Sequence, residues 1–124
     1  MKSILIVDDS AEVRKNLTKL IETLTGVQII AAVGDSPGVI KHFEKQNPDI
    51  VILDIDLEIG NGIEILSTIK NLSPATKVIM FTNYANDAFR RSTLKLGADY
   101  FLDKTQDVEK LMTILSELSE IELT

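Results

Sequence analysis

The chain has 124 residues, a formal net charge of −6, 44% hydrophobic residues and no cysteine. This length fits one ordinary domain, and the lack of cysteine excludes disulfides and thiolate metal sites. The negative charge disfavours nucleic acid and anionic lipid as partners. Because no apolar run approaches the roughly 20 residues of a membrane span, we expect a cytoplasmic protein.

Two hydrophobic periods alternate along the chain. Apolar runs rich in β-branched residues predict strands over residues 4–7, 27–33, 50–53, 78–81 and 100–102, and near-continuous runs of this kind are typical of a parallel sheet covered on both faces. Stripes with the helical period follow these runs, over residues 13–24, 39–43, 65–72, 85–92 and 108–118. In the fourth stripe the predicted face consists of small residues and Phe89.

Capping residues mark the ends of the predicted helices. Ser36, followed by proline, is typical of an N-cap, and Asn61 with Glu64 resembles a capping box. Gly26 and Gly97 lie where helices are expected to end in a left-handed residue. A strand–helix unit repeated five times predicts an α/β fold with a doubly wound parallel sheet, whose ligands bind outside the carboxyl ends of the strands.

Polar side chains follow four of the five predicted strands at those ends. Asp8 and Asp9 follow the first, Asp54 the third, Thr82 the fourth, and Lys104 the last. Singly, each residue has an ordinary structural explanation as a helix cap, a turn residue, a satisfied hydroxyl or a solvated lysine. Together they favour one functional site, because all of them converge on one edge of the sheet.

The charge at this edge indicates the chemistry of the site. If the first and third strands are neighbours, three carboxylates crowd together, and two like charges 4 Å apart repel by about 4 kcal/mol at an effective dielectric of 20. Either one carboxyl is protonated or a cation is bound. Ligands that are all oxygen favour Mg²⁺, and a carboxylate beside such an ion, a lysine and a hydroxyl is suited to phosphoryl transfer.

Five segments carry a resemblance to a known family. They are Ile-Leu-Ile-Val-Asp-Asp at 4–9, Ile-Leu-Asp-Ile at 52–55, Gly62 with Glu64, Thr82, and Gly-Ala-Asp-Tyr-Phe-Leu-Asp-Lys at 97–104. Together they resemble the receiver domain of bacterial two-component response regulators. The resemblance implies a flavodoxin-like (βα)5 fold with strand order 2-1-3-4-5, a receiver domain over residues 1–119, and a C-terminal tail or linker stub at 120–124.

The resemblance also assigns a role to each site residue. Asp54 is the expected phosphoacceptor, and Thr82 and Lys104 are expected to bind the phosphoryl group. The expected switch residues are Thr82 and Phe101, whose ring turns inward when Thr82 moves. The resemblance also implies four Mg²⁺ ligands, each of which contributes an oxygen. Asp9 and Asp54 would bind the ion directly, Asp8 through a water molecule, and Asp56 through its backbone carbonyl.

The implied function is that of a phosphoprotein in signal transduction. A sensor histidine kinase would supply the phosphoryl group, and a downstream protein target, a phosphorelay partner or an output domain of the same protein would respond. The chain would not be an enzyme beyond catalysing its own phosphoryl transfer and dephosphorylation. The switched surface would comprise the fourth helix, fifth strand and fifth helix. A homodimer contact through Ile121 and Leu123 is left open.

Three positions depart from the family pattern, and at one of them Asn83 replaces the small residue that normally follows the threonine. Glu58 and Thr105 stand where prolines are usual, and we expect the peptide bond before Thr105 to be trans, because a cis bond to a non-proline residue costs about 2.5–4 kcal/mol. Asp56 and Tyr84 occupy the positions that flank the phosphoryl group, which leads to the hypothesis that Tyr84 shields the acyl phosphate from water.

Two other function classes remain as alternatives. A phosphohydrolase of the haloacid dehalogenase type also places two aspartates two residues apart after a strand, as Asp54 and Asp56 do here, but its nucleophilic strand comes first in the chain. An unphosphorylated, receiver-like interaction module would keep the fold without the chemistry. A phosphate ester assay separates the first from a receiver, and beryllofluoride binding separates the second.

Overall fold

A computed structural model describes residues 1–120, in which five strands and five helices alternate. The strands are β1 (Lys2–Val7), β2 (Val27–Val33), β3 (Ile50–Leu53), β4 (Lys77–Thr82) and β5 (Tyr100–Asp103). The helices are α1 (Ala11–Ile21), α2 (Ser36–Lys45), α3 (Gly62–Leu72), α4 (Asp87–Lys95) and α5 (Val108–Ser119). All five predicted strands are present, and the contacts suggested for Ile121 and Leu123 lie outside the described residues.

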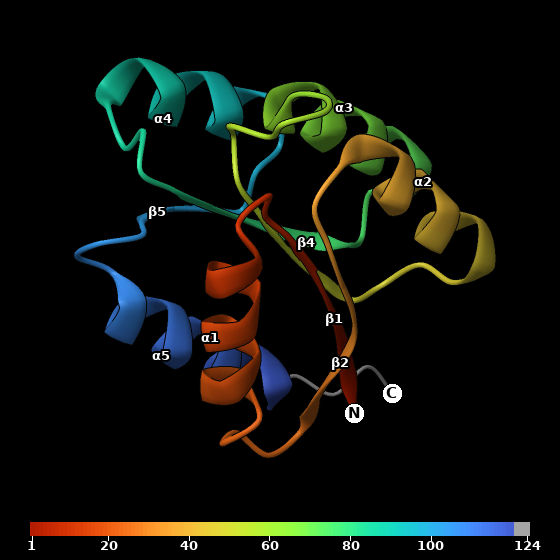
Figure 1. Cartoon of the computed structure of the whole chain (residues 1–124), viewed down its shortest axis with the longest axis vertical. Helices are drawn as coiled ribbons and strands as arrows, with labels where there is room; N and C mark the ends of the chain where they lie inside the picture. Colours follow the sequence, from red (N-terminus) through yellow and green to blue (C-terminus); the bar gives the residue numbers. More distant parts are fainter. Residues whose placement is uncertain (121–124) are drawn as a thin grey trace.

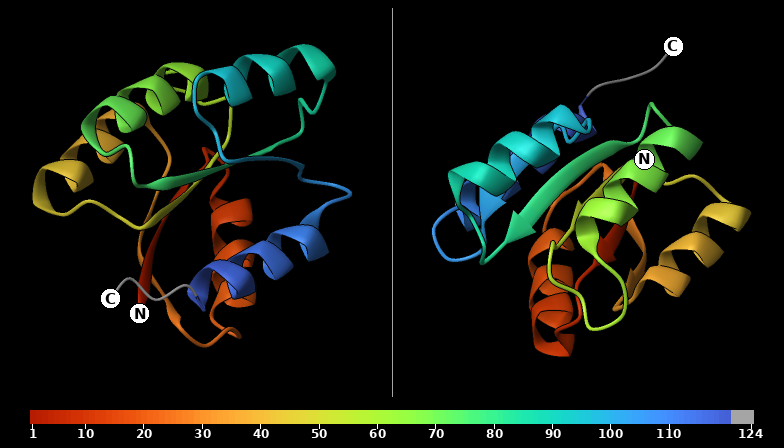
Figure 2. Two further views of the ribbon diagram at one scale, coloured as in Figure 1. Left: turned by 180° about the vertical axis from the view of Figure 1, so that it is seen from behind. Right: turned by 90° about the horizontal axis from the view of Figure 1, so that it is seen from above.

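All the strands pair in parallel, in the order β2-β1-β3-β4-β5, which confirms the expected topology. Helices α1 and α5 cover one face of the sheet, and α2, α3 and α4 cover the other (Figures 1 and 2). The central strands β1 and β3 run side by side in a register that places Val7 opposite Leu53. Their carboxyl ends therefore open at the same level of the sheet edge.

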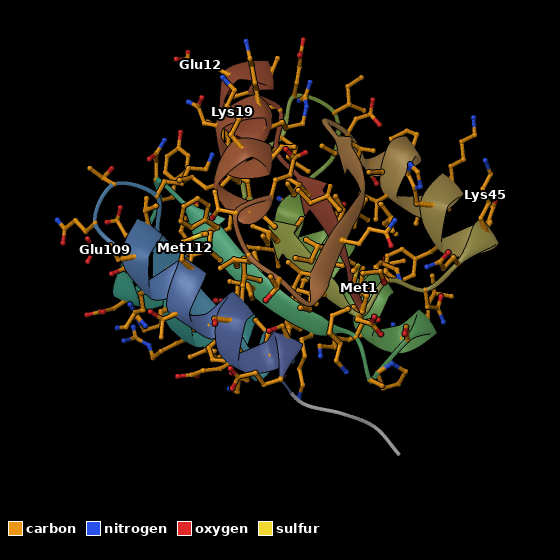
Figure 3. All side chains as sticks on the ribbon, turned by 90° about the horizontal axis from the view of Figure 1, so that it is seen from below. Met1, Glu12, Lys19, Lys45, Glu109 and Met112 are labelled. Carbon is orange, nitrogen blue, oxygen red and sulfur yellow. The ribbon has the colours of Figure 1, made fainter. Side chains whose placement is uncertain are left out.

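The core consists of two apolar clusters separated by the sheet. Leu5 and Val51 belong to the cluster under α2 and α3, whereas Ile4 and Ile50 belong to the cluster under α1 and α5. Alternate residues of one strand thus face opposite layers, which explains why the strands read as continuous apolar runs. The charged side chains of the helices point away from these layers, as those of Glu12 and Glu109 do (Figure 3).

The helix ends follow the predicted chemistry, with corrections at α1, α2 and α3. Helix α1 ends at Ile21 with Glu22 as its C-cap, so Gly26, although its φ is +82°, lies in the turn before β2 and does not end the helix. Asp35, not Ser36, is the N-cap of α2, and its carboxylate accepts the backbone N–H of Gly38 at 2.8 Å. The carboxylate outcompetes the neighbouring hydroxyl because it is the stronger acceptor. Asn61 caps α3 by accepting the N–H of Ile63 at 2.7 Å. Within residues 1–120, Glu64 does not return the second bond of a capping box.

Helix α4 differs from the prediction in the face that it buries. It begins after the N-cap Asn86, and Ala88 and Ser92 of the predicted face are exposed. The one buried residue of α4 is Thr93, whose hydroxyl donates to the carbonyl of Phe89 at 2.8 Å. A threonine can replace an apolar residue here because this bond satisfies its hydroxyl inside the helix.

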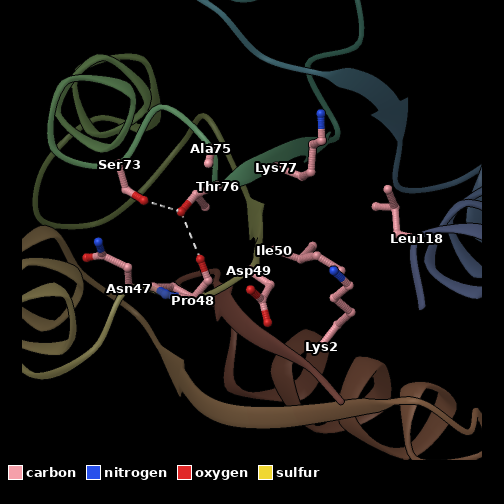
Figure 4. Close-up of a pocket in the computed structure, with 10 residues that line it drawn as sticks. All are labelled: Lys2, Asn47, Pro48, Asp49, Ile50, Ser73, Ala75, Thr76, Lys77 and Leu118. Carbon is pink, nitrogen blue, oxygen red and sulfur yellow. Dashed lines mark hydrogen bonds between the residues drawn. The ribbon is translucent and has the colours of Figure 1, made fainter. Parts of the chain in front are cut away.

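A hollow of about 370 Å³ opens at the amino-terminal edge of the sheet, opposite the acidic residues (Figure 4). Lys2 and Lys77 lie at its rim. Its inner polar groups bond to one another: the Ser73 hydroxyl lies 2.7 Å from that of Thr76, which donates to the carbonyl of Pro48 at 2.8 Å. These contacts join the ends of α3 and β4 to the loop before β3.

Among the described residues, no helix is both long enough and apolar enough to cross a lipid bilayer.

Candidate functional site

Three carboxylates meet at the carboxyl edge of the sheet. Asp8 and Asp54 each follow one of the paired residues Val7 and Leu53, so the register of β1 and β3 brings them together. One carboxylate oxygen from each of Asp8, Asp9 and Asp54 lies within 4.8 Å of the others. Asp8 and Asp54 are 2% and 5% exposed, whereas Asp9 is open to solvent.

Lys104 enters this cluster from the end of β5. Its ammonium lies 2.8 Å from Asp54 Oδ2 and also contacts Asp8 Oδ2. The backbone N–H of Lys104 donates to the carbonyl of Thr82 at 3.0 Å, which fixes the residue at the end of β4. Three carboxylates and one ammonium leave a formal charge of −2, which a divalent cation would balance.

Burial opposes ionisation in this cluster. Burial raises the pKa of Asp8 above its ordinary value, although the Lys104 ammonium and the N–H of Ser10 act in the opposite direction. Burial alone would lower the pKa of Lys104, but its contacts with Asp54 and Asp8 outweigh this and raise that pKa. At neutral pH, Lys104 is therefore a fixed positive charge between two carboxylates.

One buried oxygen of the cluster has no hydrogen-bond partner among residues 1–120. Asp54 Oδ1 is the buried side-chain oxygen for which residues 1–120 supply no hydrogen bond. Leaving a buried acceptor unsatisfied costs about 1–3 kcal/mol, so such an atom requires an explanation. A hard cation accounts for it, because every available ligand is an oxygen. The donor set therefore fits a hard divalent metal ion.

Thr82 supplies a hydroxyl beside the cluster. Its side chain is fully buried at the end of β4, the strand next to β3. Its Oγ1 accepts the backbone N–H of Tyr84 at 3.0 Å, so the hydroxyl proton is still available to another acceptor. The N–H of Tyr84 thus orients the Thr82 hydroxyl so that the hydroxyl can donate its own proton.

Asp56 and Tyr84 lie at the exposed rim of the site. The phenol of Tyr84 donates to Asp56 Oδ2 at 3.4 Å, a long contact between two exposed side chains. The loop that carries Asp56 closes on itself, because Asp56 bridges to Asn61 and the N–H of Gly62 donates to the carbonyl of Ile55. The role of the Asp56 carbonyl as a metal ligand stays a prediction.

Phe101 is already buried. It is 4% exposed, it packs in the cluster under α2 and α3, and the Arg90 guanidinium lies 5.0 Å from its ring centroid. The family resemblance implies that this ring turns inward on switching; the structure shows the ring buried, and its role as a switch stays a prediction. The bond between Lys104 and Thr105 is trans, as predicted.

Sequence reasoning missed Arg14. Its guanidinium donates to the backbone carbonyl of Asp8, and a Cβ on Gly34 would lie 2.9 Å from its Nη1. Arg14 thus holds the turn that presents the acidic pair. The available signal was a cation one helical turn after the N-cap Ser10, where acidic residues are usual.

Comparison with known proteins agrees with this geometry. Residues 4–116 match the response regulator receiver domain family. A protein-glutamate methylesterase/protein-glutamine glutaminase of Paramagnetospirillum magneticum is 36% identical over 104 residues, which are 83% of this chain and 25% of that protein. The chain spans about a quarter to a half of the length of the first curated relatives that it matches.

Solved structures share the whole fold. A LuxR family two-component response regulator from Aurantimonas sp. SI85-9A1 superposes with a TM-score of 0.88 at 27% identity, over 96% of this chain and 85% of that one. A CheY-like receiver domain protein from Methanospirillum hungatei JF-1 gives 0.86 at 27% identity, over 97% and 94%.

Proposed function

Since the chain belongs to the response regulator receiver domain family, we propose that it accepts a phosphoryl group on Asp54 from the phosphohistidine of a sensor histidine kinase. The observation that carries this proposal is the meeting of three carboxylates, one of them with an unpartnered buried oxygen, around the Lys104 ammonium. This arrangement has the charge and the ligand atoms that phosphoryl transfer to a carboxylate requires.

In the proposed reaction a carboxylate oxygen of Asp54 attacks the phosphorus in line. The P–O bond forms as the P–N bond to the kinase histidine breaks, and the electron pair leaves with the imidazole. Lys104 moves from the carboxylates to a phosphoryl oxygen, and the Thr82 hydroxyl donates its free proton to another. These two movements transmit the event to β4 and β5, where both residues are anchored.

Asp8, Asp9 and Asp54 would hold Mg²⁺, with the backbone carbonyl of Asp56 as a further ligand. When bound, the ion supplies neutralisation of the charge on the phosphoryl oxygens. Asp8 and Asp9 come from one turn and Asp54 from a neighbouring strand, so the ion would also hold these two segments together. The structure supports a divalent ion through the oxygen donor set, and Mg²⁺ is our choice because it needs only a few carboxylates.

The surface that responds would be formed by α4, β5 and α5. Its target would be another protein or an output domain of the same protein, because the chain spans a quarter to a half of several relatives. We place the reaction in the cytoplasm, where sensor kinases present their phosphohistidine, and we propose no direct nucleic-acid contact from a chain with a net charge of −6.

Binding of beryllofluoride, a phosphoryl mimic, tests the proposed function. Calorimetric titration in the presence of Mg²⁺ should give one site per chain for the wild type and none for Asp54→Asn, which lacks the anionic acceptor oxygen. Asp103→Asn is the matched control, because Asp103 is the last residue of β5 and its carboxylate accepts the N–H of Thr105 outside the cluster. No binding by the wild type would refute the phosphoacceptor assignment.

The two alternative functions predict different results in simple assays. Turnover of p-nitrophenyl phosphate would indicate a hydrolase of the haloacid dehalogenase type, whereas we expect no useful turnover from a receiver. A receiver-like interaction module would bind its partner without any response to beryllofluoride. The intact set of acidic, hydroxyl and basic side chains disfavours that module.

Tyr84→Ala should shorten the lifetime of the phosphorylated protein. The phenol lies at the rim beside Asp56, where it would limit the approach of water to the acyl phosphate. We therefore expect hydrolysis to become faster by on the order of 10-fold, which corresponds to a barrier lower by about 1.4 kcal/mol. Decay would be followed after phosphorylation with acetyl phosphate, with Tyr84→Phe as the control that retains the ring. An unchanged half-life in Tyr84→Ala would exclude the shielding role.

A further inference from the structure

Helix α4 is the helix least firmly attached to the sheet. Within residues 1–120, α3 and α5 each bury four residues, and α4 buries only Thr93. Phe89 and Ala85 add partly buried contacts to the core. Because attachment by apolar burial scales with buried area, α4 is the helix with the smallest free energy of docking. Elements of this kind are the ones that move at low energy.

The carboxyl end of α4 is anchored more strongly than its body. Gly97 ends the helix with φ of +106°, and its Cα lies so close to Lys70 that a Cβ would be 3.2 Å from Lys70 Cγ. The Lys70 ammonium donates to the carbonyl of Thr76 at 2.7 Å and to Asp99 Oδ2 at 2.9 Å. Asp99 Oδ2 also accepts the N–H of Val78 at 2.8 Å. These bonds tie the end of α4 to α3 and β4.

The amino end of α4 is connected to the candidate site instead. Only residues 83–86 separate the helix from Thr82, and the N–H of Tyr84 donates to the Thr82 hydroxyl. A displacement of Thr82 would therefore pull the amino end of α4 while the carboxyl end stays fixed. Between these two ends the body of the helix has Thr93 buried and Phe89 packed against the core, and one further contact reaches β5.

Arg90 makes that contact. Its guanidinium carbon lies 5.0 Å from the centroid of the Phe101 ring, within the range of a cation–π interaction. In residues 1–120 no carboxylate lies within 4.0 Å of Arg90, although Asp99 and Glu117 line the same groove between α4, β5 and α5. The ring is thus the partner of this charge, and α4 covers the ring through Arg90.

We infer that Arg90 is a positioning residue that holds the Phe101 ring inward and α4 against β5. This inference rests on the proposed function for its regulatory meaning: if the inward ring belongs to the phosphorylated conformation, Arg90 raises the population of that conformation before phosphorylation. A ligand that binds one conformation gains apparent affinity in proportion to its population. Arg90 would therefore tune how readily this receiver responds.

Hydrogen exchange of the free protein tests the positioning role without any phosphoryl chemistry. Arg90→Ala should speed amide exchange across residues 83–96 by about two- to fivefold, the population change that an exposed cation–π contact supports, and leave α3 and α5 unchanged. Arg91→Ala is the matched control. The Arg91 side chain is next to Arg90 in the sequence, it is exposed, and the structure gives it no partner among the described residues. Equal exchange in the two variants would overturn the inference.

Beryllofluoride titration with Mg²⁺ tests the regulatory step. Arg90→Ala should bind about two- to fivefold more weakly than the wild type, Arg91→Ala should match the wild type, and Arg90→Lys should recover most of the affinity because it keeps a cation over the ring. Unchanged or tighter binding by Arg90→Ala would overturn this step. If the wild type itself fails to bind, the proposed function falls, and the exchange result still decides the positioning role.

Discussion

Asp8→Asn should stabilise the fold and at the same time weaken the metal site. Burial is the largest influence on the Asp8 carboxyl and raises its pKa, so the ionised form is disfavoured in the folded protein. Asparagine removes the charge and keeps an oxygen for the Lys104 ammonium. We expect the free energy of unfolding to rise by about 1 kcal/mol, or roughly 4 °C in Tm, measured by urea and thermal unfolding in EDTA.

The same variant should bind Mg²⁺ about 10- to 100-fold more weakly, the usual effect of losing a group that supports a metal ion. Asp9→Asn is the control: Asp9 is exposed, so this change should weaken Mg²⁺ binding without stabilising the fold. If Asp8→Asn were no more stable than the wild type, the inference that the buried charge of Asp8 destabilises the fold would be wrong.

The stabilisation should depend on pH with a defined sign. Because the folded-state pKa of Asp8 lies above its ordinary value of 3.8, ionised Asp8 destabilises the wild type at neutral pH. As the pH falls below the folded-state pKa and then below 3.8, Asp8 becomes protonated in both states and this difference disappears. The gain from Asp8→Asn should therefore be largest near pH 7 and smallest at the acidic end of the range over which the protein still folds.

Gly62→Ala should be strongly destabilising, although α3 would gain a better helix former. A Cβ at this position would lie 2.0 Å from the carbonyl oxygen of Asp54 and 2.7 Å from the Cα of Ile55. Replacing glycine with alanine inside a helix usually gains about 1 kcal/mol, but overpacking against backbone that cannot rotate away costs about 3 kcal/mol. The cost of the clash exceeds the gain in helix propensity, and we expect Tm to fall by roughly 10 °C.

This substitution should also damage the site, because the backbone that must move carries the Asp54 side chain. Mg²⁺ affinity should fall together with stability. Gly34→Ala is the matched control: its closest conflict is with the Arg14 guanidinium, the far end of a flexible side chain, so it should unfold near the wild-type temperature. A Gly62→Ala protein as stable as the wild type would contradict the close approach of α3 to the Asp54 carbonyl.

Local pattern predicted the alternating α/β architecture and the polar residues at the carboxyl edge of the sheet, and the family resemblance added the strand order and the role of Asp56. The strand runs at 27–33 and 50–53 match β2 and β3 to the residue, because strands covered on both faces must be apolar at successive positions. Asp8, Asp54 and Lys104 were identified because parallel strands end at one edge of the sheet. A residue that directly follows such a strand has few other places to lie.

Contacts between separate segments had to come from the tertiary structure. The N-cap of α2 at Asp35, the buried Thr93, the Arg90 guanidinium over Phe101, and Gly62 against Asp54 each depend on the distance and rotation at which two elements meet. Hydrophobic period fixes the face of an element only to within about one residue's rotation. A helix as poor in apolar residues as α4 is oriented instead by single polar and cationic contacts, and these exist only after packing has brought their partners within reach.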